Sequence, residues 1–436
     1  MFKTLADAFK IKEVRNKLIL TIVLLFIYRL GCWLPIPGIE YGAFKDDING
    51  NSFLELLSAV SGGALAQGSF LALGVSPYIT SSIIIQLLSA VIPSWQRLAK
   101  EGGADGRKKI ALYTKIAALI IATAQAIGIA VGFGATENIN LNIFGGNQVI
   151  AYIFVVIMLV AGAMFTVWLG EKITEIGIGN GMSLLIFVGI LSSAGTAIMT
   201  NFQTIGVGGK TTQTAIWQFL LFVALVILIF ALVIFVDGGE RKVGVQYAKQ
   251  MKGRKMYGGQ STYIPIRVNA TGVMPIIFAS SILTFPQMLF SIFWPTATGG
   301  FIGWWTKWIG AGTWVYAILM SLLILAFAYF WTMIQFDTDE ISRQIQQNGG
   351  FIPGIRPGKP TAQYLDGINK KITLFGAIFL AFMALIPTLI FSLLNLEGLN
   401  SAFSATGMLI VVSVALEFDK QLEAQMMMRN YRGFLK

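Results

Sequence analysis

Histidine is absent from this chain of 436 residues, and cysteine occurs once, at Cys32. These two absences exclude disulfide bonds within the chain, cysteine-rich metal centres and any mechanism that needs a histidine base or ligand. Charge is scarce as well, because 12% of the residues are charged where a soluble domain carries about 25%. With 55% hydrophobic residues, the chain cannot cover a water-facing surface, so the solvent that fits it is the membrane.

Groups that could do chemistry are missing too. The centres of the apolar segments hold no carboxylate, which argues against a proton-coupled pump. The sequence Thr204-Ile205-Gly206-Val207-Gly208-Gly209-Lys210-Thr211 is similar to a phosphate-binding loop, but a threonine stands at its first glycine position and no strand precedes it. We therefore expect no enzymatic activity, no catalytic residue, no metal site and no cofactor.

Long apolar segments are what the sequence does contain. Each has close to the roughly 20 residues that a helix needs to cross a bilayer, and backbone polar groups in lipid must be satisfied within the helix. We therefore predict an all-α fold, a polytopic membrane protein with ten transmembrane helices. The segments span residues 18–35, 70–92, 112–134, 149–170, 180–200, 215–236, 271–293, 313–334, 372–394 and 401–417.

Ten spans divide into two sets of five, and an odd number in each set gives the two halves opposite orientations, as in inverted repeats. The second span of each half has an early proline followed by small hydroxyl residues, at Pro77 and at Pro275. This match indicates either a functional pair or ordinary helix packing. The predicted parts are an amphipathic N-terminal segment 1–17, a first half 18–200, a second half 201–417 and a tail 418–436.

Basic residues set the orientation. The net charge is +11, from 32 Lys and Arg against 21 Asp and Glu. The predicted outer loops contain only Lys45, Lys210 and Lys307, so the positive-inside rule places both termini in the cytoplasm. Arg29 is the one charge well inside a span, and we expect it to reach the outer interface as an anchor.

The segment from Phe53 to Ile92 is too long for one crossing, since forty helical residues would reach about 60 Å, twice the hydrocarbon thickness. Glycines at 62, 63, 68 and 74 interrupt it. We predict a short helix near residues 58–69, a break, and a full helix from about Val75. The short element is either a moving part or a re-entrant packing element.

Two large inner loops, 237–270 and 335–371, carry basic residues in ordered surroundings. The first contains Arg241, Lys252, Arg254 and Lys255, and the second presents Arg356 between prolines and glycines. Such residues suit docking of RNA phosphates or an acidic protein surface. The alternative is that they fix the orientation and contact lipid headgroups.

Together, these motifs resemble the SecY family, whose members are the central subunit of the Sec protein-conducting channel. The resemblance runs from about residue 15 to 435. The matching segments are Ser61-Gly62-Gly63-Ala64-Leu65, Pro77-Tyr78-Ile79, Ile84-Ile85-Gln86-Leu87-Leu88, Trp168-Leu169-Gly170-Glu171, Gly177-Ile178-Gly179-Asn180-Gly181, Phe278-Ala279-Ser280-Ser281 and Pro353-Gly354-Ile355-Arg356-Pro357-Gly358.

The resemblance implies two five-helix halves that form a clamshell around a central pore. It implies a plug near residues 58–69, with Ser61, Gly62, Gly63, Ala64 and Leu65. The apolar pore ring of the family corresponds to Val75, Ile79, Met182, Ile186, Ile277 and Ile410. Met182 departs from the usual Ile or Val but stays apolar, so the seal should survive. The lateral gate corresponds to Thr80, Ile83, Gln86, Gln125, Ser280 and Ser281.

The expected partners follow from the same resemblance. They are the SecE and SecG subunits, the motor ATPase SecA, the ribosome with its RNA at the inner loops, signal sequences, unfolded polypeptide and membrane lipid. The implied function is a protein translocation channel in the cell (plasma or inner) membrane that also releases apolar segments sideways into lipid. The alternative is a small-solute secondary transporter, because inverted repeats and broken helices occur there too; a purely structural membrane scaffold is disfavoured by the large ordered basic loops.

Overall fold

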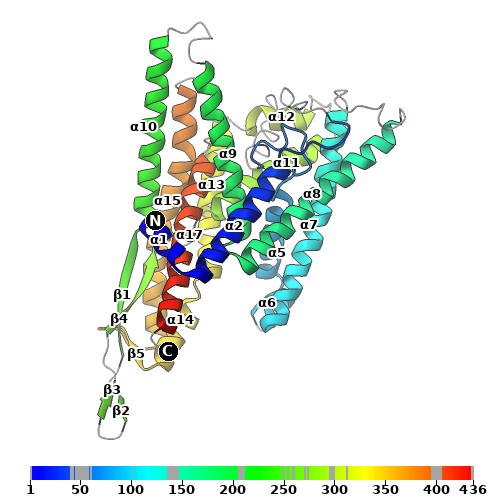
Figure 1. The fold of residues 1–436 in the computed structure, drawn as a ribbon. Coiled ribbons are helices and arrows are strands. Elements are labelled where there is room, and N and C mark those ends of the chain that lie inside the picture. The colour runs from blue at the N-terminus through cyan, green and yellow to red at the C-terminus, as the bar shows by residue number, and fades with distance from the viewer. Residues whose placement is uncertain are drawn as a thin grey trace. The chain divides into compact units, whose positions relative to one another are not determined.

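The computed structural model describes residues 2–39, 44, 58, 61–100, 102–134, 147–204, 212–247, 250–252, 255–257, 261–269, 272, 274–293, 300–310, 313–393 and 405–433. Helices dominate these residues (Figure 1). Their bounds are α1 Phe2–Lys10, α2 Lys12–Gly31, α5 Ser76–Val91, α6 Pro93–Lys100, α7 Gly103–Gly134, α8 Gln148–Ile176, α9 Gly181–Thr204, α10 Thr212–Asp237, α11 Met274–Phe293, α12 Gly300–Ile309, α13 Trp314–Gln335, α14 Thr338–Gln347, α15 Lys359–Leu393 and α17 Ala405–Gly433.

A helix occupies each of the predicted apolar segments, although the helices extend further than the segments at several ends. Among the described residues, four helical stretches are both long and apolar enough to cross a membrane. They are Asp105–Val131, Gln148–Ile176, Trp314–Gln347 and Lys359–Ile386. Shorter apolar helices include Ser76–Val91 and Gly181–Thr196.

Contacts divide the chain into two compact units. Unit 1 comprises residues 1–219, 281–316 and 388–436, and unit 2 comprises residues 220–280 and 317–387. In unit 1, α5 packs on α7, α7 on α8, α8 on α9, and α9 on α17. The small residues Ala118, Ala122 and Ala126 lie buried along α7, which allows its neighbours to approach closely.

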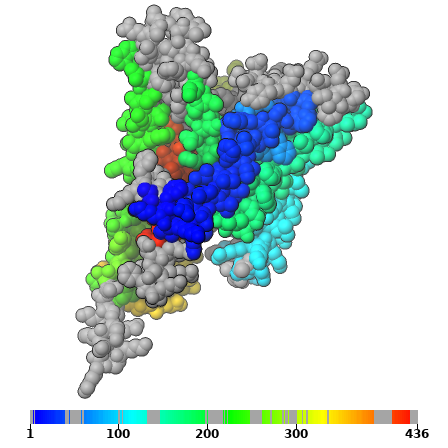
Figure 2. All heavy atoms as spheres, viewed as in Figure 1, coloured from blue at the N-terminus to red at the C-terminus, as the bar shows by residue number. Residues whose placement is uncertain are grey.

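The N-terminal helix α1 packs against α2 and α17. Ala8, Val14, Leu18, Ile178 and Leu422 form a buried cluster there, and the hydroxyl of Thr21 accepts a hydrogen bond from the backbone N–H of Ile178 at 3.1 Å. The outer side of α2 remains uncovered in Figure 2, where its side chains form a band beside α8. That band is apolar, which suits contact with lipid; its members include Ile19, Ile22, Val23, Phe26 and Leu30.

The inner loops are not purely helical, so the all-α prediction is wrong there. Strands β1 (Glu240–Tyr247) and β4 (Ser261–Arg267) pair antiparallel, and β5 (Gly350–Phe351) adds to the other edge of β1. Figure 1 shows β1 and β4 continuing from the end of α10. The physical reason is a period-two alternation in which Val243, Val245 and Ile266 are buried against Ile345 and Leu365. A second hairpin joins β2 (Gln250–Lys252) to β3 (Lys255–Tyr257).

Candidate functional site

Residues 61–75 precede α5 and are packed into unit 1. They form consecutive turns, so the predicted short helix near 58–69 is not found within residues 61–69. The physical reason is left-handed backbone at Gly62, Gly63, Gly68 and Gly74, whose φ angles are 72°, 82°, 63° and 53°. The full helix α5 then begins at Ser76, as predicted to within a residue. We call residues 61–75 the turn segment.

The turn segment is tied to the chain that follows α2. The N–H of Phe70 donates to the carbonyl of Leu34 at 2.9 Å, and the N–H of Ile36 donates to the carbonyl of Gly68 at 2.9 Å. Ser61, Ala64 and Leu65 are buried, as are Gly62 and Gly68. Leu65 belongs to a core that includes Ala122 and Ala126 of α7 and Val155 and Leu159 of α8. The segment is therefore an integral part of the packing of unit 1.

Three helices approach the turn segment so closely that side chains would not fit. A Cβ on Gly62 would lie 3.0 Å from the Cα of Gly189 on α9. A Cβ on Gly162 of α8 would overlap the carbonyl oxygen of Phe70, and one on Gly31 of α2 would come within 2.5 Å of Leu71. Glycine at these positions lets α2, α8 and α9 hold the segment on three sides.

Arg29 contacts the turn segment directly. Its Nη1 donates a hydrogen bond of 2.9 Å to the carbonyl oxygen of Gly62, and its guanidinium carbon lies 5.5 Å from the centroid of the Trp33 ring. The sequence predicted only an interfacial anchor here. The signal that could have pointed further was the expense of a charge so far inside an apolar segment.

The predicted ring residues are placed as follows. Val75 and Ile79 lie one turn apart at the start of α5, Met182 and Ile186 lie one turn apart at the start of α9, and Ile410 lies near the start of α17. These five belong to unit 1, whereas Ile277 on α11 belongs to unit 2. Val75, Ile186 and Ile410 are buried within their unit, and Ile79, Met182 and Ile277 are half-buried. The ring itself stays a prediction.

The start of α9 is fixed by the preceding loop. The side chain of Asn180 accepts a hydrogen bond from the N–H of Met182 at 3.1 Å, as a helix cap does. The hydroxyl of Thr174 accepts from the N–H of Gly181 at 2.8 Å. A Cβ on Gly170 of α8 would lie 2.5 Å from the Sδ of Met182. The Gly-Ile-Gly-Asn-Gly motif therefore positions Met182 against α8.

The predicted gate residues carry hydroxyls that bind their own helices. Thr80 donates to the carbonyl of Ser76 at 3.1 Å, and Ser280 donates to the carbonyl of Ile277 at 3.0 Å. Ser81 and Ser82 of α5 follow the same pattern, each donating at 2.8 Å to a carbonyl three residues earlier. These bonds move with the helix that makes them.

The amides and Ile83 complete the predicted gate. Ile83 and Gln125 are buried in unit 1, Gln86 is half-buried, and Ser281 is half-buried on α11. The side-chain oxygen of Gln86 is buried without a hydrogen-bond donor. An unpaired amide oxygen costs free energy in the packed state, so Gln86 lowers the stability of the packing around α5.

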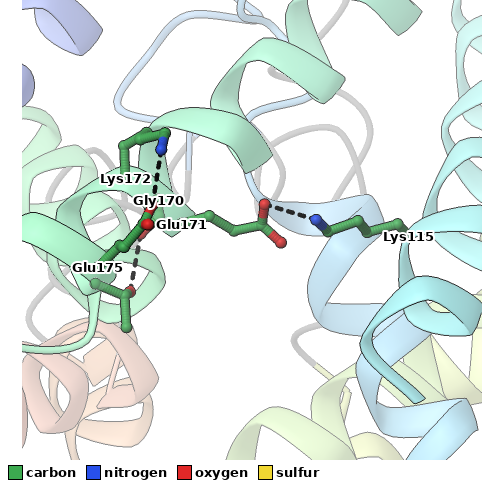
Figure 3. Close-up of polar contacts among 6 residues, drawn as sticks. Lys115, Gly170, Glu171, Lys172 and Glu175 are labelled. Carbon is green, nitrogen blue, oxygen red and sulfur yellow. Dashed lines mark hydrogen bonds and ion pairs between the residues drawn. The ribbon is translucent and has the colours of Figure 1, made fainter. Parts of the chain in front are cut away.

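An ion pair joins α7 to α8. Lys115 Nζ lies 2.8 Å from Glu171 Oε2, and Figure 3 shows the two side chains pointing toward each other from their helices. Both side chains are more than a third exposed. A second pair, Lys172 with Glu175 at 2.7 Å, lies within α8 and joins no other helix. The Trp-Leu-Gly-Glu motif thus ends in a residue that connects two helices of the predicted gate region.

We expect the Lys115–Glu171 pair to contribute about 0.2–1 kcal/mol, since exposed pairs are screened by solvent. A double-mutant cycle with Lys115→Ala and Glu171→Ala, read from thermal unfolding in detergent, should give that coupling energy between α7 and α8. Exchanging the charges, as Lys115→Glu with Glu171→Lys, should restore most of the loss. The pair Lys172 and Glu175 is the matched control within one helix. A coupling energy of zero would refute the link.

The docking residues lie in unit 2, with different degrees of description. Arg241 is exposed on β1, opposite Ile266 of β4. Lys252 and Lys255 form the closing pair of the β2–β3 hairpin, and Arg254 lies outside the described residues. Lys242, beside Arg241, places its Nζ 4.7 Å from the centroid of the Tyr263 ring.

Arg356 is exposed on an ordered turn. The hydroxyl of Thr361 donates to the carbonyl of Arg356 at 2.8 Å, and the hydroxyl of Ser342 donates to the carbonyl of Gly358 at 2.8 Å. Gly354 and Gly358 have φ angles of 81° and 95°, which glycine permits. The prediction of a charge presented by a fixed turn agrees with this geometry.

A search for metal sites was negative within the described residues, where no group of three or more His, Cys, Asp or Glu side chains gathers. Apolar helices, a packed turn segment and exposed basic turns therefore characterise the molecule. These features define a multi-pass membrane protein.

The comparisons place the chain within that class. The family model described as SecY matches residues 69–418. Proteins named protein translocase subunit SecY are 39% identical in Mycobacterium bovis, over all of both chains, and 39% identical in Thermus thermophilus, over all of this chain and 98% of that one. The chain belongs to the SecY family.

Solved structures show the same fold. A structure titled as a protein conducting channel has a TM-score of 0.66 at 18% identity, covering 94% of this chain and 91% of that one. Sec61 in the canine ribosome–channel complex from the endoplasmic reticulum has a TM-score of 0.62 at 17% identity, with the same coverage. The small-solute transporter that the sequence left open is not favoured by these relatives.

Proposed function

We propose that this chain forms a channel that passes unfolded polypeptides across a membrane and releases apolar segments sideways into lipid. The observation that carries this proposal is the full-length match, at 39% identity, to translocase subunits. The turn segment before α5 adds support, because it is a compact non-helical element held among helices. Irregular backbone at membrane depth is tolerated only where protein surrounds it or water lines it.

The proposed seal is a ring of Val75, Ile79, Met182, Ile186, Ile277 and Ile410 in a ten-helix clamshell. Such side chains offer no hydrogen bonds to water or ions, so a narrow ring excludes both. They also favour no particular sequence, which suits passage of any unfolded chain. The turn segment, as the proposed plug, covers this ring when no polypeptide is present.

The proposed lateral gate lies along α5, α7 and α11. Its hydroxyls bond within their own helices, so separating the helices breaks none of those bonds. A signal sequence then partitions into lipid, since Leu, Ile, Phe and Val each favour the bilayer centre by about 0.3–0.6 kcal/mol. A run of ten gains a few kcal/mol, which is enough to shift a conformational equilibrium of that size.

The proposed partners meet the basic turns on the cytoplasmic side, where both termini also lie. Arg241, Lys252, Arg254, Lys255 and Arg356 offer positive charge to the ribosome, its RNA and the motor ATPase SecA. SecE braces the back of the clamshell and SecG lies at its periphery. The related Sec61 structure is titled as a ribosome–channel complex, which agrees with a ribosome partner. Energy comes from these partners, and the chain itself is not an enzyme.

Crosslinking tests the proposal. Because the chain has one native cysteine, Cys32, a Cys32→Ser background leaves a single engineered thiol. We expect a stalled secretory chain to form adducts with cysteines placed at Ile79 and at Ile277. A cysteine at Phe235, which is exposed on α10, is the control and should give none. Adducts at Phe235 without any at the two ring positions would contradict the channel.

A further inference from the structure

The contact between Arg29 and the turn segment is not accounted for by any of the roles above. Its hydrogen bond joins residues 33 positions apart, from the end of α2 to the carbonyl of Gly62. Trp33, four residues along from Arg29, stacks on the same guanidinium. Within the described part of the chain the charge is thus held by a carbonyl and an indole rather than by a carboxylate.

Gly62 needs a donor at this place. It is buried, and its φ of 72° turns the chain so that its carbonyl reaches Arg29. On its other side Gly189 of α9 stands so close that a Cβ on Gly62 would meet its backbone at 3.0 Å. A buried carbonyl without a donor costs free energy, so Arg29 stabilises this one conformation of Gly62 between α2 and α9.

We propose that Arg29 is a positioning residue that latches the turn segment in the packed state, and that breaking its bond to Gly62 is a required step when the segment is displaced. This inference rests on the proposed function of the segment as a plug. A single charged donor is well suited to the role, because a hydrogen bond to a charged group is strong yet reversible. The arginine keeps water nearby as an alternative partner once the segment leaves.

The native Cys32 provides a reporter for this movement. Its side chain is buried, and its Sγ lies 3.9 Å from the carbonyl oxygen of Ser61, the residue before Gly62. Displacing the turn segment uncovers Cys32. Since no other cysteine occurs in the chain, a membrane-impermeant maleimide added to proteoliposomes of the full chain measures this exposure alone.

The experiment compares Arg29→Gln with the unchanged chain. We expect Cys32 in Arg29→Gln to be labelled about tenfold faster, which corresponds to about 1.4 kcal/mol, and the ion leak of the vesicles to rise. Arg29→Lys keeps the charge and a donor, so it should be intermediate. Lys307→Gln is the matched control, because it removes an exposed cation from the predicted outer side without touching the turn segment.

Unchanged labelling of Cys32 in Arg29→Gln would overturn the latch. So would faster labelling that is matched by a fall in the thermal unfolding temperature and by equally fast labelling of Arg29→Lys, since that pattern reports general loosening. A deletion of residues 61–65 separates the two ideas. If that deletion leaks no ions, the plug is refuted; if it leaks while Arg29→Gln labels slowly, the plug stands and the latch fails.

Discussion

Replacing Ile186 by Asn is expected to make the closed channel leak ions. Ile186 is buried near the start of α9, one turn from Met182, and the apolar surface of one such side chain is worth about 1.5–3 kcal/mol. An amide in its place hydrates the proposed ring, so the equilibrium between dry and wet states should shift by about tenfold or more. Conductance of the purified complex in planar bilayers, with no polypeptide present, measures this.

A matched control lies on the same helix. Leu191 is exposed on α9, so Leu191→Asn introduces the same amide on a face that the proposed pore does not use. Its conductance should stay at the level of the unchanged protein. Equal leaks from both variants would show that the amide loosens the helix generally, and a tight Ile186→Asn channel would remove Ile186 from the seal.

Reversing the charge of Arg356 should abolish partner-driven export. The turn that carries this residue is fixed by two hydroxyl groups, so its charge is presented in one place. Losing a charge pair at a docking surface costs about 2–5 kcal/mol, which weakens docking by at least about tenfold. Export of a secretory precursor into inverted vesicles, together with binding of the motor or the ribosome, measures the loss in Arg356→Glu.

Two further variants separate the charge from its presentation. Arg343→Glu makes the same change of charge on an exposed residue of α14 and should leave docking nearly intact. Ser342→Ala with Thr361→Ala keeps the charge but frees the turn, so we expect a partial loss of docking. If Arg343→Glu weakens docking as much as Arg356→Glu, only the net charge of the loop matters.

The helices could be predicted from sequence because lipid imposes a simple rule. A run of apolar residues of sufficient length must satisfy its backbone within a helix, and segments such as 149–170 and 372–394 indeed lie within α8 and α15. The start of α5 at Ser76 could be placed because Gly74 and Pro77 mark it. The presented turn at Arg356 was predictable for the same reason, since proline and glycine restrict the backbone there.

Other features depend on contacts that sequence patterns do not reveal. The strands β1 and β4 follow a clear alternation, but charged neighbours such as Arg241 and Lys242 made the region read as a polar loop. The turn segment contains helix-forming residues such as Leu65, yet four glycines with positive φ override their preference. The bond from Arg29 to Gly62 joins distant positions, and no local spacing announces such a contact.

The serine hydroxyls of α5 donate to carbonyls of that same helix. When α5 leaves a neighbour, these groups therefore require neither water nor a proton to replace a lost partner. The work of separation is then a contest between side-chain packing and the acyl chains that fill the seam. We expect the ease of opening to follow lipid composition, with saturated, tightly ordered chains resisting it and loosely packed unsaturated chains favouring it.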